Sequence, residues 1–215
     1  MKTRALHRGL ADQQGAFAER FILGRMSGFE KDIKICLTAV PSTDRKGLTH
    51  AYFPALAACL GTLEYMSGLF KGNIESVGWR DVWAWSQRYL PQPDYEEDVV
   101  RVLVEAFRNS IAHRGIASGV WVDKKPNPGM PKRRFTWSVH ADSRRPAITF
   151  AAEDRVLRSD PPWDCPYSHR AHIRLLALFV DIRAAANAYA EEVRENDKLQ
   201  KKFFACMKQL YPEDQ

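Results

Sequence analysis

Three segments of this chain place apolar residues at alternating spacings of three and four, and this pattern restricts the fold more than any other feature. The segments run over residues 22–40, 53–70 and 175–193. A spacing of this kind aligns one face of a helix and lets that face pack against other helices. Pro41 and Gly72 follow the first two segments as helix-ending residues. The pattern therefore predicts a mainly α chain whose long helices form a multi-helix up-down bundle.

Two shorter helices are predicted between the second and third apolar segments. They cover residues 79–90 and 94–112, and the second begins with acidic residues that suit the positive end of a helix dipole. Ser168 is a suitable N-cap for the last long helix. That helix is expected either to stop at Asp197 or to continue, bent, to Leu210.

The segment at about 117–153 has a different period. Apolar and polar residues alternate over 135–139, and short β-rich runs lie on either side at 119–122 and 147–150. This pattern predicts a small β-meander. Because predicted helices precede and follow it, we expect an insertion in a single helical domain that covers residues 1–215.

The positive charge of the chain is concentrated in one place. The formal net charge is +6, and the segment 114–145 alone carries eight basic and two acidic residues. Such a patch can attract a polyanion. If that polyanion is RNA, the candidate RNA-binding residues are Arg114, Lys124, Lys125, Lys132, Arg133, Arg134, Arg144 and Arg145.

Cysteine spacing and hydropathy indicate the compartment. Cys36, Cys59, Cys165 and Cys206 are scattered and form no C-x-x-C pair, which favours a reducing cytoplasm over a disulfide framework. The longest clean apolar run is 175–180, well short of the roughly 20 residues that span a bilayer. The N-terminus has basic residues without the apolar stretch of a signal peptide. We expect a cytoplasmic protein without a membrane partner.

Polar residues that could take part in catalysis or binding lie at the end of the predicted helix 94–112. Asn109 and His113 are four residues apart and share a helix face, with Glu105 one turn earlier. Arg108 and His113 are separated by roughly 140° around an ideal helix, so they do not converge within it. Either the last turn unwinds before Gly115, or another surface completes the site.

The sequence Arg108-Asn109-x3-His113 resembles the R-x4–6-H motif of the HEPN superfamily (higher eukaryotes and prokaryotes nucleotide-binding domains). A similar bare spacing also occurs at Arg45…His50 and at Arg133 or Arg134…His140. Asn109, and the position late in an amphipathic helix, distinguish the first match. The resemblance covers the helical pattern over about 17–210, but its specific part is these six residues, and the β-segment departs from a minimal HEPN domain.

The resemblance implies a helical bundle that acts as a metal-independent endoribonuclease, of the kind found among toxins and phage-defence effectors. The substrate would be RNA and the nucleophile its own 2′-hydroxyl, leaving a 2′,3′-cyclic phosphate. His113 would be the general acid/base, Arg108 would stabilise the phosphate charge, and Asn109 would orient either group. No cofactor or metal is implied. The implied partners are a second copy that forms a composite site and an antitoxin or nucleotidyltransferase-like protein.

Two other interpretations of the same residues stay open. A non-catalytic HEPN-like module could bind nucleotide, RNA or a partner protein. A helical scaffold subunit could use Arg108 and His113 only to satisfy helix-terminal carbonyls and the helix dipole.

The remaining candidates favour structural roles. Cys165-x3-His169-x2-His172 lacks the spacing and the fourth ligand of a zinc site, so we expect two solvent-facing histidines at the start of a helix. With Arg170 and Arg174 they form a cluster that could add to an RNA-binding surface. We expect the aromatic face that includes Phe135 and Trp137 to pack on the bundle, because alternation usually means one buried face.

The tryptophans of the predicted helix 79–90 have the same kind of structural interpretation. Trp79, Trp83 and Trp85 have helical spacing, which favours packing over a ligand-binding box.

Overall fold

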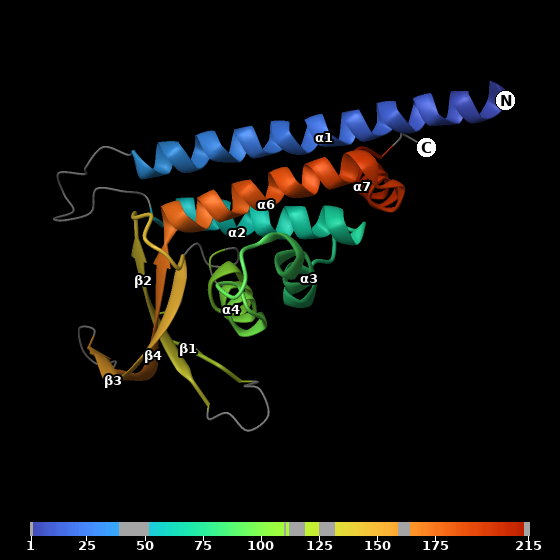
Figure 1. Ribbon diagram of the computed structural model, residues 1–215. Coiled ribbons are helices and arrows are strands. Elements are labelled where there is room, and N and C mark those ends of the chain that lie inside the picture. Colours follow the sequence, from blue (N-terminus) through green and yellow to red (C-terminus); the bar gives the residue numbers. More distant parts are fainter. Residues whose placement is uncertain are drawn as a thin grey trace.

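Long helices form most of the fold, and a sheet extends from one end of them (Figure 1). The computed structural model describes residues 2–38, 52–109, 111, 119–124, 132–158 and 164–212. Helices α1 (Lys2–Leu37), α2 (Tyr52–Lys71) and α6 (Leu175–Glu195) lie side by side. The N-terminal end of α1 lies at the end of the molecule opposite the sheet.

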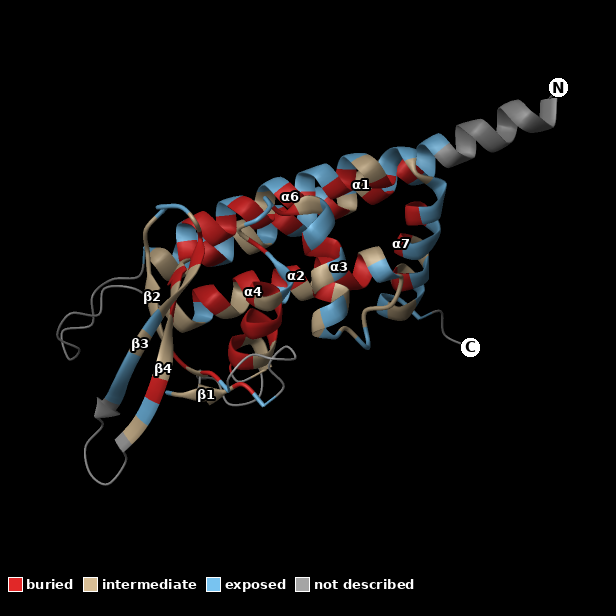
Figure 2. Cartoon of the chain, turned by 60° about the horizontal axis from the view of Figure 1, so that its bottom comes forward, coloured by how far each residue is buried: buried red, intermediate tan, exposed pale blue. Residues whose placement is uncertain are grey.

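The predicted apolar segments form the core where these three helices meet. Ile22 of α1, Leu56 of α2 and Ile182 of α6 are fully buried and belong to one hydrophobic cluster. Figure 2 shows the buried residues on the sides of these helices that face one another. The prediction of three long packed helices is confirmed, although α1 begins twenty residues before position 22 and ends at Leu37.

Gly72 and Asn196 follow the C-terminal ends of α2 and α6. Gly72 follows α2 with φ of +91°, and its N–H donates to the carbonyl of Gly68 at 2.9 Å. A left-handed residue at this position favours glycine. After α6, Asn196 accepts hydrogen bonds from the N–H groups of Lys198 and Leu199 and so begins α7 (Asp197–Leu210). The predicted continuation to Leu210 is confirmed, with a break at Asn196.

Helix α2 passes a simple test for membrane spanning by length and composition, but 56% of its apolar stretch is buried inside the molecule. Such burial is expected of the central helix of a bundle, because its neighbours cover it on several sides.

The shorter helices are α3 (Trp79–Tyr89), α4 (Glu97–Val102) and the π-helix η1 (Leu103–Arg108), which continues α4 directly. Of these, α3 and η1 lie against α2, and α4 lies against α3. Asn109 closes η1, since its N–H donates to the carbonyl of Val104, five residues earlier. Short π-helical turns inside α-helices are frequent at functional sites.

The sheet has four strands in the order β1-β2-β4-β3. These are β1 (Trp121–Val122), β2 (Arg134–His140), β3 (Ile148–Arg158) and β4 (Asp164–Arg174). Strand β4 lies parallel to β2 and antiparallel to β3. The predicted meander is therefore wrong in its connectivity, because β4 separates β2 from β3, and the strand-rich segment extends beyond 153 to Arg174.

The prediction that Ser168 caps a helix is also wrong. Ser168 lies in the middle of β4, and α6 begins only at Leu175. The strand has a period-two pattern, in which Ala171 and Ile173 are buried while Arg170 and His172 point to the other face. The long register with β2 and β3 satisfies the backbone of this segment, which a helix start would not do.

Candidate functional site

Arg108 lies at the end of η1, where its guanidinium contacts α2. Its Nε and Nη2 donate to the two carboxylate oxygens of Glu64, and its Nη1 donates to Oδ1 of Asn109 at 2.9 Å. The side chains of Arg108 and Glu64 are 26% and 24% exposed. Because the two helices hold both partners, the plane of the guanidinium is fixed while part of it stays accessible.

The pair leaves Arg108 able to take a further ligand. A guanidinium has five N–H donors, and three of those on Arg108 donate within the part of the chain that the structure describes. A planar fork of this kind matches phosphate oxygens. A phosphate would approach next to Glu64, whose negative charge offsets part of the attraction.

Other members of the predicted motif are placed differently. Glu105 lies 3.5 Å from Nη1 of Arg101 and so belongs to a structural ion pair rather than to the Arg108 site. His113 lies outside the described residues, as do Arg114 and Lys125. The geometry therefore tests only the Arg108 and Asn109 half of the motif.

Among the predicted RNA-binding residues, Arg133 needs a correction. It is only 8% exposed, and its Nη1 and Nη2 donate to Asp98 at 2.6 and 2.7 Å. Nη2 also donates to Asp123 at 3.0 Å. A guanidinium that is buried and paired with two carboxylates is not presented to a polyanion, so the geometry gives Arg133 a structural role.

Arg133 belongs to a network that fastens the sheet to α4. Asp123, which follows β1 and is fully buried, accepts from Nη1 and Nη2 of Arg101 at 2.9 and 2.8 Å. Arg101 and Arg133 also share Asp98. We call Asp98, Arg101, Asp123 and Arg133 the sheet clamp. Burial alone would raise the pKa of Asp98, but hydrogen bonds from Arg133 and Arg101 outweigh it and hold that pKa below its ordinary value.

The other predicted basic residues divide into exposed and paired groups. Lys124 and Lys132 are exposed. Arg144 pairs with Asp142 at 2.7 Å on the surface, and Arg145 pairs with the buried Asp181 of α6. Arg134 donates from Nε to the carbonyl of Pro166 at 2.6 Å.

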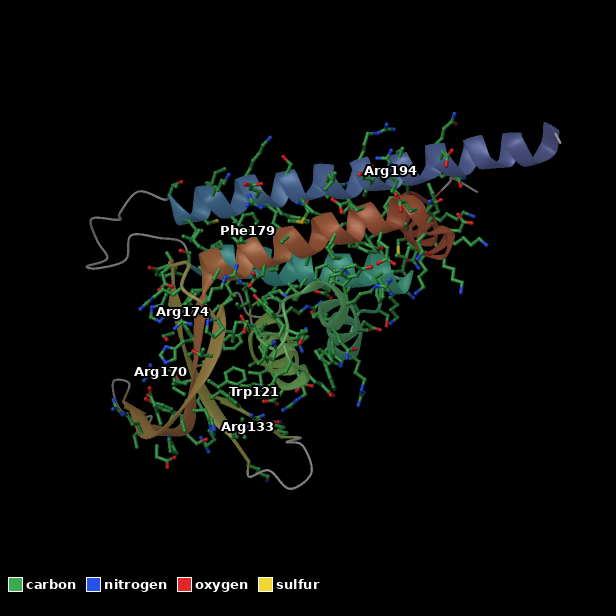
Figure 3. The ribbon with its side chains drawn as sticks, viewed as in Figure 1. Trp121, Arg133, Arg170, Arg174, Phe179 and Arg194 are labelled. Carbon is green, nitrogen blue, oxygen red and sulfur yellow. The ribbon has the colours of Figure 1, made fainter. Side chains whose placement is uncertain are left out.

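The aromatic residues of β1 and β2 face the helices, as predicted. Phe135 is buried, and its ring centroid lies 5.9 Å from that of Trp121. Trp137 meets Phe53 of α2 edge-on at 5.1 Å. Figure 3 shows Trp121 and Arg133 on the side of the sheet that faces α4. The rings therefore stabilise the sheet against the bundle and are not presented for base stacking.

The tryptophans of α3 also pack inward. Trp85 is fully buried, and Trp79 and Trp83 pack against the core. This agrees with the predicted packing role and gives no ligand-binding box.

The two histidines expected at a helix start lie instead on β4, on opposite faces. His172 Nδ1 lies 2.8 Å from Ser138 Oγ, which is also 3.0 Å from His140 Nε2. His169 contacts Phe135 on the inner face, with ring centroids 5.2 Å apart. Within the described ranges no group of three or more His, Cys, Asp or Glu side chains is arranged to hold a metal ion.

Surface hollows among the described residues lie along α6, at its junction with α7 and beside α1, and acidic residues such as Glu192, Glu195 and Asp197 line them. A negative lining repels a polyanion, so these hollows are not suited to a phosphate.

Comparison with known proteins adds no assignment: no family model, curated protein or solved structure matches this chain. Any functional conclusion must therefore come from the residues and their geometry.

Proposed function

We propose that this chain is a metal-independent endoribonuclease of the HEPN type. The observation that carries the proposal is the oriented guanidinium of Arg108, held by Glu64 and Asn109 at the end of a π-helical turn. This arrangement supports a phosphate-binding role for the arginine of the R-N-x3-H motif. We also propose that the helices form an HEPN-like up-down bundle.

In the proposed reaction the 2′-hydroxyl oxygen of RNA attacks the adjacent phosphorus. The bond from phosphorus to the 5′-oxygen breaks, and the products are a 2′,3′-cyclic phosphate and a 5′-hydroxyl. His113 moves the proton between the attacking and leaving oxygens, alone or with its copy in a second subunit. Arg108 stabilises the charge that grows on the phosphate oxygens. Glu64 and Asn109 fix the guanidinium plane, so little reorganisation is needed during the reaction.

The biological setting belongs to the same proposal. We place the enzyme in the cytoplasm as a homodimer with a composite site, acting as a toxin or phage-defence effector. An antitoxin or nucleotidyltransferase-like protein would control it.

One observation favours a second candidate, a non-catalytic HEPN-like module that binds nucleotide, RNA or a partner protein. Glu64 already neutralises Arg108 through two hydrogen bonds, which weakens the stabilisation that Arg108 could give to a transition state while its other N–H groups can still bind a ligand. The two candidates differ in whether RNA is cut, since they share the same binding residues.

The deciding experiment is RNA cleavage in the presence of a chelator. The purified protein should cut a mixed set of RNAs and leave cyclic phosphate ends, and Arg108→Ala and His113→Ala should each remove the activity. Arg194→Ala is the control, because Arg194 also pairs with a glutamate of another helix, Glu19, but on a more exposed surface away from η1. Intact RNA would rule out the enzyme and leave the binding module, and equal cleavage by Arg108→Ala would show that the cleavage does not come from the proposed site.

A further inference from the structure

The face of the sheet that points away from the helices is built differently from the inner face. The register places Arg170 beside Thr136, His172 beside Ser138 and Arg174 beside His140. Alternate residues share a face in a strand, so the basic and imidazole side chains gather on the outer face while Phe135 and Ile173 point inward. Figure 3 shows Arg170 and Arg174 on the side away from Trp121.

The cations of this outer face are fixed and only partly neutralised. Arg170 donates to Glu153 and to the hydroxyl of Tyr167. Arg174 donates to the carbonyl of Pro146 and lies 3.6 Å from Asp142. No carboxylate pairs with Arg134 among the residues described in the structure, and its Nε is held by a backbone carbonyl.

His172 lies among cations on this face, but burial is the first cause of its shifted pKa. Burial, and then the nearby His140, Arg170 and Arg174, lower the pKa of His172, and the single carboxylate of Glu153 does not compensate. Ser138 and Thr149, which neighbour His172 in the sheet, add hydroxyl groups.

We propose that the outer face of the sheet, formed by Arg134, His140, Arg170, His172 and Arg174, binds the sugar-phosphate backbone of single-stranded RNA. Charge complementarity selects this occupant. On β4 the cationic and imidazole groups recur every second residue, about 6.6 Å apart, and so form a row of contacts for successive phosphates. The aromatic residues of β1 and β2 lie on the opposite face, and Tyr167, which contacts Arg170, is buried, so this surface offers little stacking and follows the backbone without reading the bases. This inference rests on the proposed function for its choice of RNA.

The test uses a fluorescent 2′-O-methyl oligoribonucleotide, which can bind but has no free 2′-hydroxyl to attack the phosphate. Anisotropy gives Kd at several salt concentrations for the wild type and for the triple variant Arg134→Gln, Arg170→Gln, Arg174→Gln. Each phosphate contact contributes about 0.7 to the slope of log K against log salt for a single strand. The triple variant should therefore lose about 2 from that slope and at least tenfold in affinity at the lowest salt.

A control triple variant removes the same net charge elsewhere. Lys31, Lys198 and Lys201 are exposed on α1 and α7, and their change to Gln should leave the slope within about 0.5 of the wild-type value. Replacing the three sheet arginines with Lys should keep most of the affinity, because charge rather than fork geometry carries backbone contact. If the Gln triple variant unfolds, Arg134→Gln alone should still lower the slope by about 0.7.

The results separate this inference from the proposed function. Equal binding by the sheet and control variants would overturn the inference even if RNA is cut normally. Binding that depends on the sheet arginines would support it even if no RNA is cut. Failure of the oligonucleotide to bind, together with capture of poly-glutamate, would replace RNA with an acidic protein partner.

Discussion

The sheet clamp gives the sharpest stability prediction. We expect Asp123→Ala to destabilise the protein strongly, because Asp123 is fully buried and accepts three hydrogen bonds of 2.8–3.0 Å from Arg101 and Arg133. The change leaves Asp98 as the remaining clamp carboxylate opposite two guanidiniums. Hydrogen bonds to charged groups contribute about 1.5–3 kcal/mol each, but removing a carboxylate also removes the cost of burying it.

Broken buried ion pairs typically cost about 3–5 kcal/mol. For a domain of this size each kcal/mol lowers Tm by about 2–4 °C, so we expect a decrease of about 6–20 °C. Arg144→Ala is the control, because Arg144 is 73% exposed and pairs only on the surface, and its Tm should match the wild type.

Thermal unfolding followed by circular dichroism measures this difference, and hydrogen exchange shows where it acts. Strands β1 and β2 should lose protection first, because the clamp ties them to α4. A Tm for Asp123→Ala close to that of Arg144→Ala, with unchanged exchange in Arg134–His140, would refute the structural role of the clamp. Arg133 would then be restored as a candidate RNA contact.

Three further predictions follow from single contacts. Gly15→Ala should lower the free energy of unfolding in urea by about 1–3 kcal/mol, because a Cβ would lie 2.2 Å from the carbonyl oxygen of Arg194. Gly24→Ala, with nothing within 4 Å of the added Cβ, should raise it by about 1 kcal/mol. Equal effects of the two variants would contradict the contact at Gly15. Because the pKa of His172 is lowered in the folded protein, the unfolded chain binds more protons than the folded one below pH 6.5. The free energy of unfolding should therefore fall as the pH falls from 6.5. In thermal scans, His172→Asn should flatten this dependence of Tm on pH. Glu64→Gln should reduce the rate of RNA cleavage about tenfold or more by releasing the guanidinium of Arg108; faster cleavage would mean that Glu64 competes with the phosphate.

The helical part of the fold could be predicted because its signal is long and local. Each apolar seam extends over several turns, and residues such as Ile22 and Ile182 are buried where the period places them. The strand β4 could not be recognised in the same way. Its histidines and arginines resemble the polar start of a helix, and the burial of Ala171 and Ile173 depends on pairing with β2 and β3, which are distant in sequence.

The candidate site was predictable only in part, for a related reason. The motif identifies Arg108 and Asn109, but no local pattern indicates that Glu64, forty-four residues earlier, contacts the guanidinium. The sequence shows only that Glu64 is an isolated glutamate on the partly exposed side of a core helix. This does not indicate which residue it contacts. Glu105 pairs with Arg101, four residues earlier, a spacing that any α-helix brings together.

Charge counting locates positive residues but not positive surface. The segment 114–145 carries the whole excess of basic over acidic residues. Within it, however, Arg133 is paired inside the sheet clamp and Arg145 is paired with Asp181. Arg170 lies outside that segment and reaches the outer face of the sheet only because β4 inserts between β2 and β3. A polyanion responds to charge that the fold leaves accessible, so the arginines of the outer face should affect RNA binding more than Arg133 does. The sequence predicts Arg133 and Arg134 alike as RNA contacts, whereas the fold buries Arg133 in the clamp and places Arg134 on the outer face.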